Sequence, residues 1–563
     1  MRVFFAVFAI LATAMVSFAG WQWFNRPVPV ALSYDEAFPS VSFAPFRRGQ
    51  SPISHDYPPP QQIEEDLKSL VGVARGVRTY TSLEGMSAVP AFARKYGLEV
   101  THSAWLGEKV AVNEREVAAL IDAANKYPDV IKRVIVGNEV LLRQDLPVEQ
   151  LRRYIRQVRA AVKQPVSYAD VWAFWLKNPQ LAEDVDYITV HILPYWEDEP
   201  VGVDDAAEHI VKIYHMMQQA FPGKPILIGE AGWPTRGRNR GPAAVNMESA
   251  AKFVRTLAKV SKANGFDYNV VEAFDQPWKA FLEGSVGAKW GVVDENRRVK
   301  FSMSGPVQDN PDWKIHASIS LVLGTLGGVW FLRRPRRYHP ASAIAIAALA
   351  QLLSAAVVWQ ALNAEALAYD LVTDIYAWMR IAIHAAFAAL ILRAAGDSFA
   401  DGAGPAVSRW GERLLTFYAA AAVVSTAIIF FHGRYRDIPN LEFLVPCVGL
   451  TAYALARMVV LRKPALKAFA AGRLFYGKPE GGFGPAKPVT LALLISAVAA
   501  PLSESIALYL GDDFKAMHPD LSQQIPLMAK IFVANTEMLV WSAMLVVMAL
   551  PFAAEWWRTA TRR

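Results

Sequence analysis

The sequence predicts a TIM (β/α)8 barrel, an α/β fold, followed by an all-α polytopic transmembrane bundle. Three observations lead to this prediction. Residues 40–312 are rich in charge and alternate short β-type runs with amphipathic helical stretches. Residues 315–555 consist of long apolar runs whose charges are confined to short breaks. The 563 residues are 53% hydrophobic and only 19% charged, whereas soluble domains carry about 25% charge, so part of the chain should lie in a membrane.

The N-terminus carries an apolar run from Val3 to about Phe24, directly after the basic residue Arg2. A run of this length can cross a hydrocarbon core of about 30 Å, which favours a signal anchor within residues 1–30. The triplet Ser17–Ala19 also has the small-x-small pattern of a cleavage site, so removal of the segment is the alternative. In either case, residues 31–312 are expected outside the cytoplasm.

Residues 313–563 predict a C-terminal membrane domain of about seven helices. The apolar segments are about 315–332, 340–362, 371–394, 413–431, 440–461, 488–510 and 527–551. A soluble helical bundle is the alternative, but runs this long and apolar are typical of membrane spans.

The breaks between these segments alternate in charge. One set of breaks, together with the C-terminus, holds Arg333, Arg334, Arg336, Arg337, Arg393, Arg409, Arg413, Arg462, Lys463, Lys467, Arg473, Lys478, Lys487, Arg558, Arg562 and Arg563. The other set holds only Arg434, Arg436 and Lys515. Because basic loops stay in the cytoplasm, the first set and both termini are predicted to be cytoplasmic, with the soluble domain outside.

The charge and cysteine content exclude several functional classes. The net charge is +7 and the pI is about 9.2. The basic residues cluster beside apolar segments, which indicates a lipid bilayer as partner and no nucleic acid. Cys447 is the only cysteine, so a single chain cannot form a disulfide or a thiolate metal site.

The soluble part switches between strand and helix periodicity eight times over about 260 residues, as a TIM barrel requires. The β-type runs are 41–46, 77–80, 98–103, 134–138, 165–169, 187–191, 226–229 and 269–274. Helix-patterned stretches between them include 63–70, 114–127, 148–162, 206–220 and 248–264. A doubly wound open sheet is the alternative, but no Gly-rich phosphate fingerprint follows the first strand.

Two glutamates come directly after predicted strands. Glu139 follows the fourth strand and Glu230 follows the seventh. Barrel active sites lie at the carboxyl ends of the strands, so the two carboxylates should face each other across the barrel mouth. A separation of about 5–5.5 Å would support a retaining glycosidase mechanism, with one acid/base and one nucleophile. Either glutamate alone could be a solvated loop residue.

The residues around both glutamates resemble glycoside hydrolase family 17, the β-1,3-glucanase family. The matching motifs are Val136–Val140, Gly229–Thr235, Val77–Tyr80, Glu272–Lys279 and Lys289–Gly291, and the resemblance covers about residues 40–302. It implies that Glu139 is the acid/base, that Glu230 is the nucleophile, and that Asn138 hydrogen-bonds the sugar 2-hydroxyl. No cofactor is implied.

The sequence departs from the family pattern at two places. Gln276 stands where the family often has glutamate, which removes a charge near the site. His191 opens the segment His191–Tyr195 where the family often has Asn-x-Tyr-Pro-Tyr. Tyr195 keeps the position whose hydroxyl can touch the nucleophile in this family.

Further candidates for substrate binding lie at or near the predicted strand ends. They are Arg78, Tyr80, Asp170, Tyr195, Trp196, Trp233 and Lys279, in addition to Asn138. For Arg78, Tyr80 and Asp170 the alternative is that they support the site residues without touching the sugar. Aromatic faces stack on sugar rings, although core packing is the alternative for each tryptophan. Arg78 and Lys279 are expected to hold a catalytic carboxylate ionised. The histidines His102, His191 and His209 are dispersed and lack ligand spacing, so no metal site is predicted.

Four ionisable residues fall inside or beside the predicted spans: Arg380, His384, Glu504 and Glu537. Arg380 and His384 are four residues apart and share a helix face. They could bind a glucan or a lipid-linked sugar, or line a conduit. The alternative is that Arg380 pairs with Glu504 or Glu537 and holds helices together, as intramembrane charges commonly do.

The fusion of this domain to many spans resembles the bacterial proteins linked to β-(1→6) bonds in periplasmic cyclic β-glucans. The leading hypothesis is therefore a membrane-anchored transglycosylase in the bacterial inner membrane, whose partners are β-glucan and, as a candidate, a glucan synthase. It would act on β-1,3-glucan through a glycosyl-enzyme on Glu230 and form new linkages, with β-1,6 as one candidate. A β-1,3-glucan hydrolase using the same residues and a non-catalytic export or assembly component are the alternatives.

Overall fold

The computed structural model describes residues 2–332, 338–400, 409–475 and 485–561. The chain divides into two compact units. The barrel unit comprises Pro27–Gln308 and Gly511–Gln524, and the helical unit comprises Met1–Arg26, Asp309–Leu510 and Ile525–Arg563. Seven of the basic residues that predict the topology lie outside the described residues: Arg333, Arg334, Arg336, Arg337, Lys478, Arg562 and Arg563.

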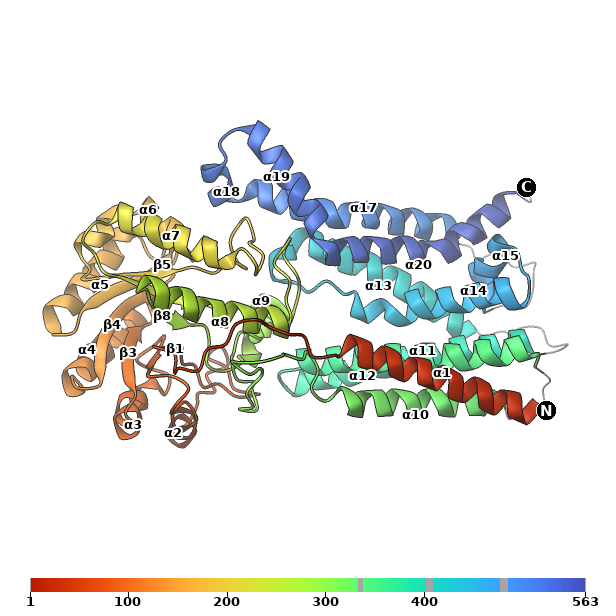
Figure 1. The fold of residues 1–563 in the computed structure, drawn as a ribbon. Helices are drawn as coiled ribbons and strands as arrows, with labels where there is room; N and C mark the ends of the chain where they lie inside the picture. Colours follow the sequence, from red (N-terminus) through yellow and green to blue (C-terminus); the bar gives the residue numbers. More distant parts are fainter. Residues whose placement is uncertain (1, 333–337, 401–408, 476–484, 562–563) are drawn as a thin grey trace. The chain divides into compact units, whose positions relative to one another are not determined.

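Eight parallel strands form a closed barrel in sequence order (Figure 1). They are β1 (Val41–Ser42), β2 (Gly76–Arg78), β3 (Glu99–Ala104), β4 (Ile131–Asn138), β5 (Val166–Val171), β6 (Ile188–His191), β7 (Ile226–Ala231) and β8 (Asp267–Val270). The barrel closes where Val41 of β1 pairs with Val270 of β8. This closure confirms the predicted TIM barrel and excludes the open-sheet alternative.

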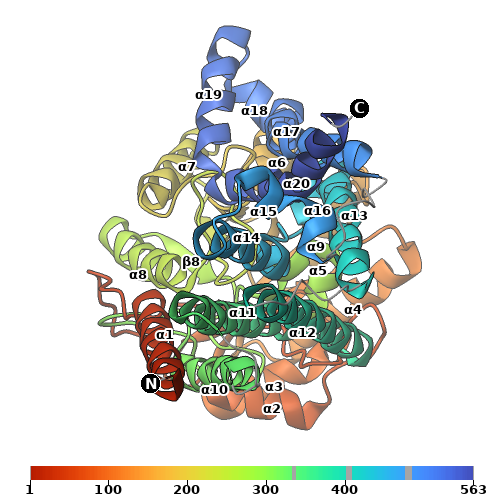
Figure 2. The same ribbon diagram turned by 90° about the vertical axis from the view of Figure 1, so that its right-hand side faces the viewer.

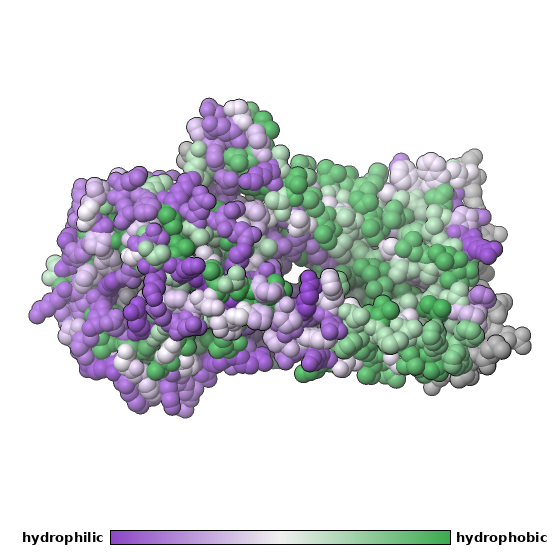
Figure 3. Space-filling view, in the orientation of Figure 1, coloured by the Kyte–Doolittle hydropathy of each residue, from purple (hydrophilic) through white to green (hydrophobic). Residues whose placement is uncertain are grey.

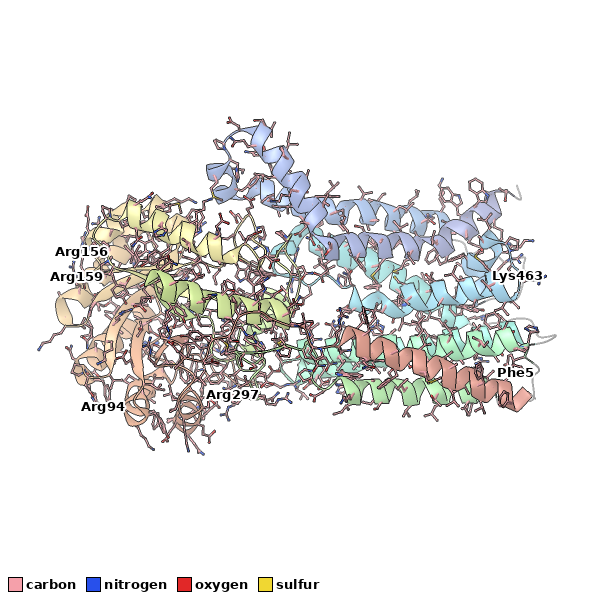
Figure 4. All side chains as sticks on the ribbon, viewed as in Figure 1. Phe5, Arg94, Arg156, Arg159, Arg297 and Lys463 are labelled. Atoms are coloured by element: carbon pink, nitrogen blue, oxygen red, sulfur yellow. The ribbon has the colours of Figure 1, made fainter. Side chains whose placement is uncertain are left out.

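Helices surround the barrel and pack one apolar face against it. They are α2 (Pro60–Ser69), α3 (Val89–Tyr96), α4 (Val110–Lys126), α5 (Val148–Ala161), α6 (Trp172–Lys177), α7 (Ala206–Ala220), α8 (Met247–Asn264) and α9 (Ala280–Ala288), with short 3-10 turns η1 (Met86–Ala88), η2 (Pro179–Glu183) and η3 (Pro277–Lys279). In α5 the buried residues are Leu151, Tyr154, Ile155 and Val158, which lie three or four apart. Arg156 and Arg159 lie on the outer face of the same helix (Figure 4).

The first and last strands end earlier than the sequence predicts. The run predicted over 41–46 contributes only β1, because Pro45 has no backbone N–H to continue a ladder. The run predicted over 269–274 is regular strand only to Val270, although the N–H of Val271 still donates to Ala231 and that of Ala273 to Ser42, each at 3.0 Å. Its continuation bonds elsewhere, since the N–H of Asp275 donates to the carbonyl oxygen of Val293 at 3.0 Å.

The helical unit contains seven described helices that are long and apolar enough to cross a membrane. They lie in α1 (Arg2–Phe24), α10 (Trp313–Leu332), α11 (Pro340–Leu367), α12 (Leu371–Phe399), α13 (Arg409–His432), α17 (Ala486–Leu510) and α20 (Thr536–Ala560). The helices of this unit carry a largely hydrophobic surface, whereas the barrel surface is largely hydrophilic (Figure 3). Figure 2 shows the helices of this unit nearly end-on.

Two predicted spans differ from continuous long helices. The segment 440–461 folds as the 3-10 turn η5 (Leu441–Phe443), the π-helix η6 (Val445–Gly449) and α14 (Leu450–Val460), whose joint helical stretch is shorter than the others. The segment 527–551 is divided between α19 (Leu521–Ala534) and α20. The side chain of Asn535 caps α20 by accepting from the N–H of Met538. Shorter elements complete the unit: η4 (Gly433–Tyr435), α15 (Ala465–Phe469) and α16 (Ala471–Leu474). The helix α18 (Asp512–Met517) belongs to the barrel unit.

The ionisable residues of the spans pair with partners that the sequence did not predict. Arg380 of α12 forms an ion pair with Glu442 in η5, so its predicted pairing with Glu504 or Glu537 is wrong. The side chain of Gln360 donates to the backbone oxygen of Glu442 at 2.7 Å. His384 is hydrogen-bonded to the hydroxyl of Tyr418. These contacts join α11 and α12 to η5 and join α12 to α13, which accords with a structural role for Arg380.

A buried arginine joins the two segments that flank the barrel. Arg255 of α8 donates from Nη1 to the carbonyl oxygens of Val30 (3.0 Å) and Leu32 (2.8 Å). Its Nη2 donates to those of Ser302 (2.7 Å) and Gly305 (3.0 Å). The side chain of Arg255 is fully buried, so its guanidinium depends on these four carbonyl groups in place of water. Arg255 thus fixes the entry and exit segments of the barrel unit.

We expect Arg255→Met to destabilise the barrel by about 3 kcal/mol, because four hydrogen bonds from one charged group, which join the two flanking segments, would be lost. For a domain of this size the midpoint of thermal unfolding should fall by at least about 5 °C. Tryptophan fluorescence of the full-length protein in detergent measures this shift. Arg298→Met is the control, since its ion pair with Asp294 is exposed and should change stability by under about 1 kcal/mol. Equal midpoints for both variants would contradict the role given to Arg255.

Candidate active site

The predicted catalytic residues lie together at the carboxyl ends of the strands. Glu139 directly follows β4, and Glu230 is the second-last residue of β7. His191 ends β6 and Arg78 ends β2. The barrel therefore brings together four polar side chains from four strands, as the architecture requires of an active site.

The two glutamates lie at the distance expected for a retaining pair. One carboxylate oxygen each of Glu139 and Glu230 and one ring nitrogen of His191 all lie within 4.8 Å of one another. Inverting enzymes need about 6.5–9.5 Å between their carboxyl groups to accommodate a water molecule, whereas retaining enzymes need about 5–5.5 Å. The spacing therefore favours direct attack by one carboxylate on the anomeric carbon.

Arg78 organises the nucleophile side of this site. Its guanidinium is fully buried and donates to Glu230 Oε1 at 3.0 Å, to the carbonyl oxygen of Gly229 at 2.8 Å and to Asn138 Oδ1 at 2.5 Å. The expected contact between Arg78 and a catalytic carboxylate is present. Since Oδ1 of Asn138 accepts from Arg78, its amide nitrogen remains the donor end of that side chain. This orientation suits the predicted contact of Asn138 with a sugar hydroxyl.

Glu139 has an unusual backbone conformation. Its φ is 52°, in the left-handed region that non-glycine residues seldom adopt, and Gly137 before it has a φ of 86°. A Cβ at Gly137 would lie 2.8 Å from Val140 Cγ2, so the turn needs glycine there. The N–H of Glu139 donates to the carbonyl oxygen of Ala169 at 2.8 Å, which fixes the turn to β5. Strain of this kind is concentrated at functional sites.

Neighbouring charges set the protonation of Glu139. Burial would raise the pKa of Glu139, but the hydrogen bond and charge of His191, with Arg143 and Arg78, hold it below its ordinary value. His191 Nδ1 lies 2.9 Å from Glu139 Oε1. In the free protein Glu139 is therefore a carboxylate, although a general acid must carry a proton at the moment of cleavage.

Asp170 lies beneath Glu139 and is fully buried. It accepts from the hydroxyl of Tyr168 and, at 2.8 Å, from the N–H of Val171. Burial, and next the charge of Glu139, raise the pKa of Asp170 to about 7. Because Asp170 has no exposed surface, its contacts fit the alternative role of supporting the site better than direct contact with a sugar. Tyr168 also accepts from the N–H of Leu141 at 3.0 Å, so this pair supports the Glu139 turn.

Lys279 pairs with a third buried carboxylate. Its Nζ lies 3.2 Å from Oε1 of Glu272, which is fully buried. Burial raises the pKa of Glu272 to about 7, against the opposing charge of Lys279. The expected direct pairing of Lys279 with a catalytic carboxylate is replaced by this pair, and Lys279 acts on Glu230 only through its charge. Gln276 is buried and donates to the carbonyl oxygens of Ala44 and Phe274.

The structure contradicts two predicted contacts: stacking of Trp233 on a sugar, and contact of the Tyr195 hydroxyl with the predicted nucleophile. Trp233 is only 1% exposed and its indole N–H donates to the carbonyl oxygen of Ala244, so it packs in the core and cannot stack on a sugar. The hydroxyl of Tyr195 donates to the carbonyl oxygen of Arg238 at 2.8 Å, which leaves no proton for the nucleophile. Tyr80 is half-buried and donates to Ser42 Oγ at 3.0 Å.

Trp196 retains the properties of a sugar platform. It is half-buried and stacks nearly parallel on Trp290, with ring centroids 6.3 Å apart and an interplanar angle of 18°. The guanidinium of Arg240 lies 5.5 Å above the Trp196 ring. A flat aromatic surface beside a hydrogen-bond donor is the usual arrangement for binding a sugar ring.

His191 is the residue that sequence reasoning missed. It was grouped with dispersed histidines, yet it lies between the two glutamates. The signal was available, because His191 ends the sixth predicted strand and barrel geometry places strand ends together. The trio of Glu139, His191 and Glu230 is held by mutual contacts and by Arg78, a cation already in place. The expected absence of metal and cofactor stays a prediction.

Comparison with known proteins identifies the type of domain. Residues 40–291 match the family model of the BtgE/BtgC glycoside hydrolase domain. The barrel is similar to a glycoside hydrolase domain. The chain is 26% identical over 258 residues to a glucan 1,3-beta-glucosidase of Schizosaccharomyces pombe, covering 42% of this chain and 79% of that protein. It is 27% identical over 302 residues to the putative glucan endo-1,3-beta-glucosidase btgC of Aspergillus niger, covering 47% of this chain and only 43% of that protein.

A solved structure also matches about half of this chain. A β-1,3-glucanosyltransferase from Rhizomucor miehei, solved as an active-site mutant with laminaritriose, is 26% identical with a TM-score of 0.42. The match covers 47% of this chain and 95% of that chain. The comparisons thus concern about half of the chain described here.

We expect Arg78→Met to lower kcat on the order of 10²–10³-fold, because the nucleophile and Asn138 would lose a preorganised donor. Initial rates of the full-length protein on linear β-1,3-gluco-oligosaccharides measure this loss. Arg133→Met is the control, since Arg133 pairs with Asp267 on the partly exposed side of the barrel. An Arg78→Met protein with the rate of the control would show that Arg78 is only structural.

Proposed function

We propose that the chain is a membrane-anchored, retaining enzyme of the family 17 type that transfers β-1,3-glucan units through a covalent ester on Glu230. The observation that carries this proposal is the separation of at most 4.8 Å between the nearest side-chain oxygens of Glu139 and Glu230. The glycoside hydrolase match and relatives named for β-1,3-glucan support the substrate class.

Each residue has a defined role in the proposed reaction. Glu139 protonates the leaving glycosidic oxygen while Glu230 attacks the anomeric carbon. Arg78 holds Glu230 as a carboxylate directed at that carbon. In the second step Glu139, now a carboxylate, removes the proton of the incoming hydroxyl, which displaces Glu230. If that hydroxyl belongs to a sugar, a new linkage forms, and β-1,6 is the linkage that we propose to test first.

We expect full-length protein with linear β-1,3-gluco-oligosaccharides to give products longer or more branched than the substrate. Glu230→Ala and Glu139→Ala should each reduce turnover on the order of 10⁴-fold or more. Glu36→Ala, whose carboxylate is exposed on the barrel surface, should not. Mass spectrometry and linkage analysis identify the products. Shorter products alone would make the enzyme a hydrolase, which is the second candidate function.

Azide separates the two glutamate roles. In Glu139→Ala, azide should replace the acceptor and give a β-glycosyl azide, because the ester on Glu230 still forms. In Glu230→Ala, azide should enter the vacated nucleophile position and give the α-glycosyl azide. An unchanged glucan phenotype in cells that carry either alanine variant would instead favour a non-catalytic export or assembly role.

We also propose that the chain lies in the bacterial inner membrane with its barrel in the periplasm and both ends in the cytoplasm. The seven long helices and the shorter Val445–Val460 helix would make eight crossings. The start of α1 and the end of α20 lie at the same end of the helical unit (Figure 1). Lys463 lies at that end as well (Figure 4), where the positive-inside rule places basic residues.

Cysteine labelling tests this topology. In a Cys447→Ala background, we expect Arg94→Cys on the barrel surface to react with a membrane-impermeant maleimide in intact spheroplasts. Lys463→Cys should react only after the membrane is permeabilised. Both side chains are exposed, so access to the reagent and not burial decides the result. Labelling of Lys463→Cys in intact spheroplasts would contradict the proposed orientation.

A further inference from the structure

His191 is enclosed between the two catalytic carboxylates. Its side chain has no exposed surface, with Nδ1 at 2.9 Å from Glu139 Oε1 and Nε2 at 3.6 Å from Glu230 Oε1. Gly229 leaves space for the ring, since a Cβ there would lie 2.3 Å from Thr189 Cγ2 and 3.4 Å from His191 Cδ2. One imidazole therefore faces an oxygen of each reacting glutamate.

The groups around His191 make an anionic pocket with cations behind it. Glu139 faces the ring from the end of β4, Asp170 from β5 and Glu230 from β7. Arg78 of β2 lies beyond Glu230, and Arg143 acts on the far side of Glu139.

Further charges act at longer range. Lys279 and Glu283 act on Glu230 by charge. A neutral imidazole has one N–H and can donate to only one glutamate, whereas an imidazolium can donate to both.

We propose that His191 is a positioning residue that stores the proton of the general acid and exchanges it with Glu139 in step with the charge on Glu230. This inference rests on the proposed retaining function. It adds a proton-storing residue that the pair of glutamates does not require.

In the free enzyme the stored proton lies on the imidazole, between two carboxylates. During glycosylation it moves from Nδ1 to Glu139 and on to the leaving oxygen, while the bond between the anomeric carbon and that oxygen breaks. Glu230 forms its ester bond in the same step and loses its negative charge. His191 is then neutral with its remaining proton, and the pair has released one proton to the departing sugar.

The second step reverses this transfer. The incoming hydroxyl gives its proton to Glu139 as its oxygen bonds the anomeric carbon and the ester bond to Glu230 breaks. Glu230 regains its negative charge, which again favours an imidazolium beside it. The proton returns to His191, so atoms and charges balance over one turnover.

The test is the pH dependence of kcat/KM for the full-length protein. Imidazole titrates near 6.5 and a glutamate carboxyl near 4.3 in solution. Without the imidazole, the proton must stay on Glu139 alone, so the alkaline limb should move to lower pH by about one unit or more in His191→Asn and in His191→Gln. Asparagine can replace the donor toward Glu139, and glutamine the donor toward Glu230.

His102→Asn is the matched control. His102 is also fully buried at a strand of the barrel, but its Nδ1 contacts Thr79 Oγ1 at 2.8 Å and no catalytic residue. Its alkaline limb should coincide with that of wild type. A purely structural role for His191 would lower kcat in both variants without moving the limb, and this result would overturn the proposal.

A second measurement uses wild-type protein and does not depend on the folding of variants. A 2-deoxy-2-fluoro glucosyl fluoride should esterify Glu230 and release fluoride without needing a proton. The pair of Glu139 and His191 should then release a proton to the solvent. An indicator dye detects this proton between about pH 5 and 8. Ester formation without proton release would overturn the role of His191 alone. Absence of the ester, by mass spectrometry, would overturn the proposed function and this inference together.

Discussion

The contact between Arg78 and Glu230 is the interaction on which the rest of the site depends. A fully buried guanidinium is tolerated only if its charge and donors are satisfied. Here the carboxylate of Glu230 supplies the charge, and Asn138 and the carbonyl of Gly229 accept from the terminal guanidinium nitrogens, whereas Nε has no partner among the described residues. One side chain from β2 therefore fixes residues of β4 and β7, which are not neighbours in the sheet. The position of the nucleophile is set by barrel closure and not by a flexible loop.

Opposite charges alternate across the mouth of the barrel. Arg78, Glu230, His191, Glu139 and Arg143 form a continuous sequence in which each anion lies between two cations or potential cations. Such a preorganised arrangement stabilises charge that develops in the reaction without reorienting solvent. It also explains why Glu139 is a carboxylate at rest despite its burial. The proton needed for catalysis must then be held nearby, and the imidazole is the group placed to hold it.

The sequence was sufficient to predict the barrel, its eight strands and the meeting of Glu139 with Glu230, because strand periodicity and barrel geometry determine them. It could not reveal the left-handed backbone of Glu139 or the contact of His191, since these depend on side-chain packing between strands. Trp233 was misjudged for the same reason: proximity in sequence to a strand end does not determine exposure. Arg380 was paired wrongly because a span predicted over 440–461 begins instead as a short turn.

The choice between transfer and hydrolysis is not made by the catalytic trio. Glu139 removes a proton from water or from a sugar hydroxyl by the same step, and Glu230 leaves in the same way. The outcome depends on which acceptor occupies the second site while the ester persists. In the proposed reaction, the half-buried Trp196, backed by the buried Trp290, is the aromatic face on which a sugar acceptor would stack, and it gives no comparable hold on water. On this proposal Trp196, and not the two glutamates, should govern the ratio of transfer to hydrolysis.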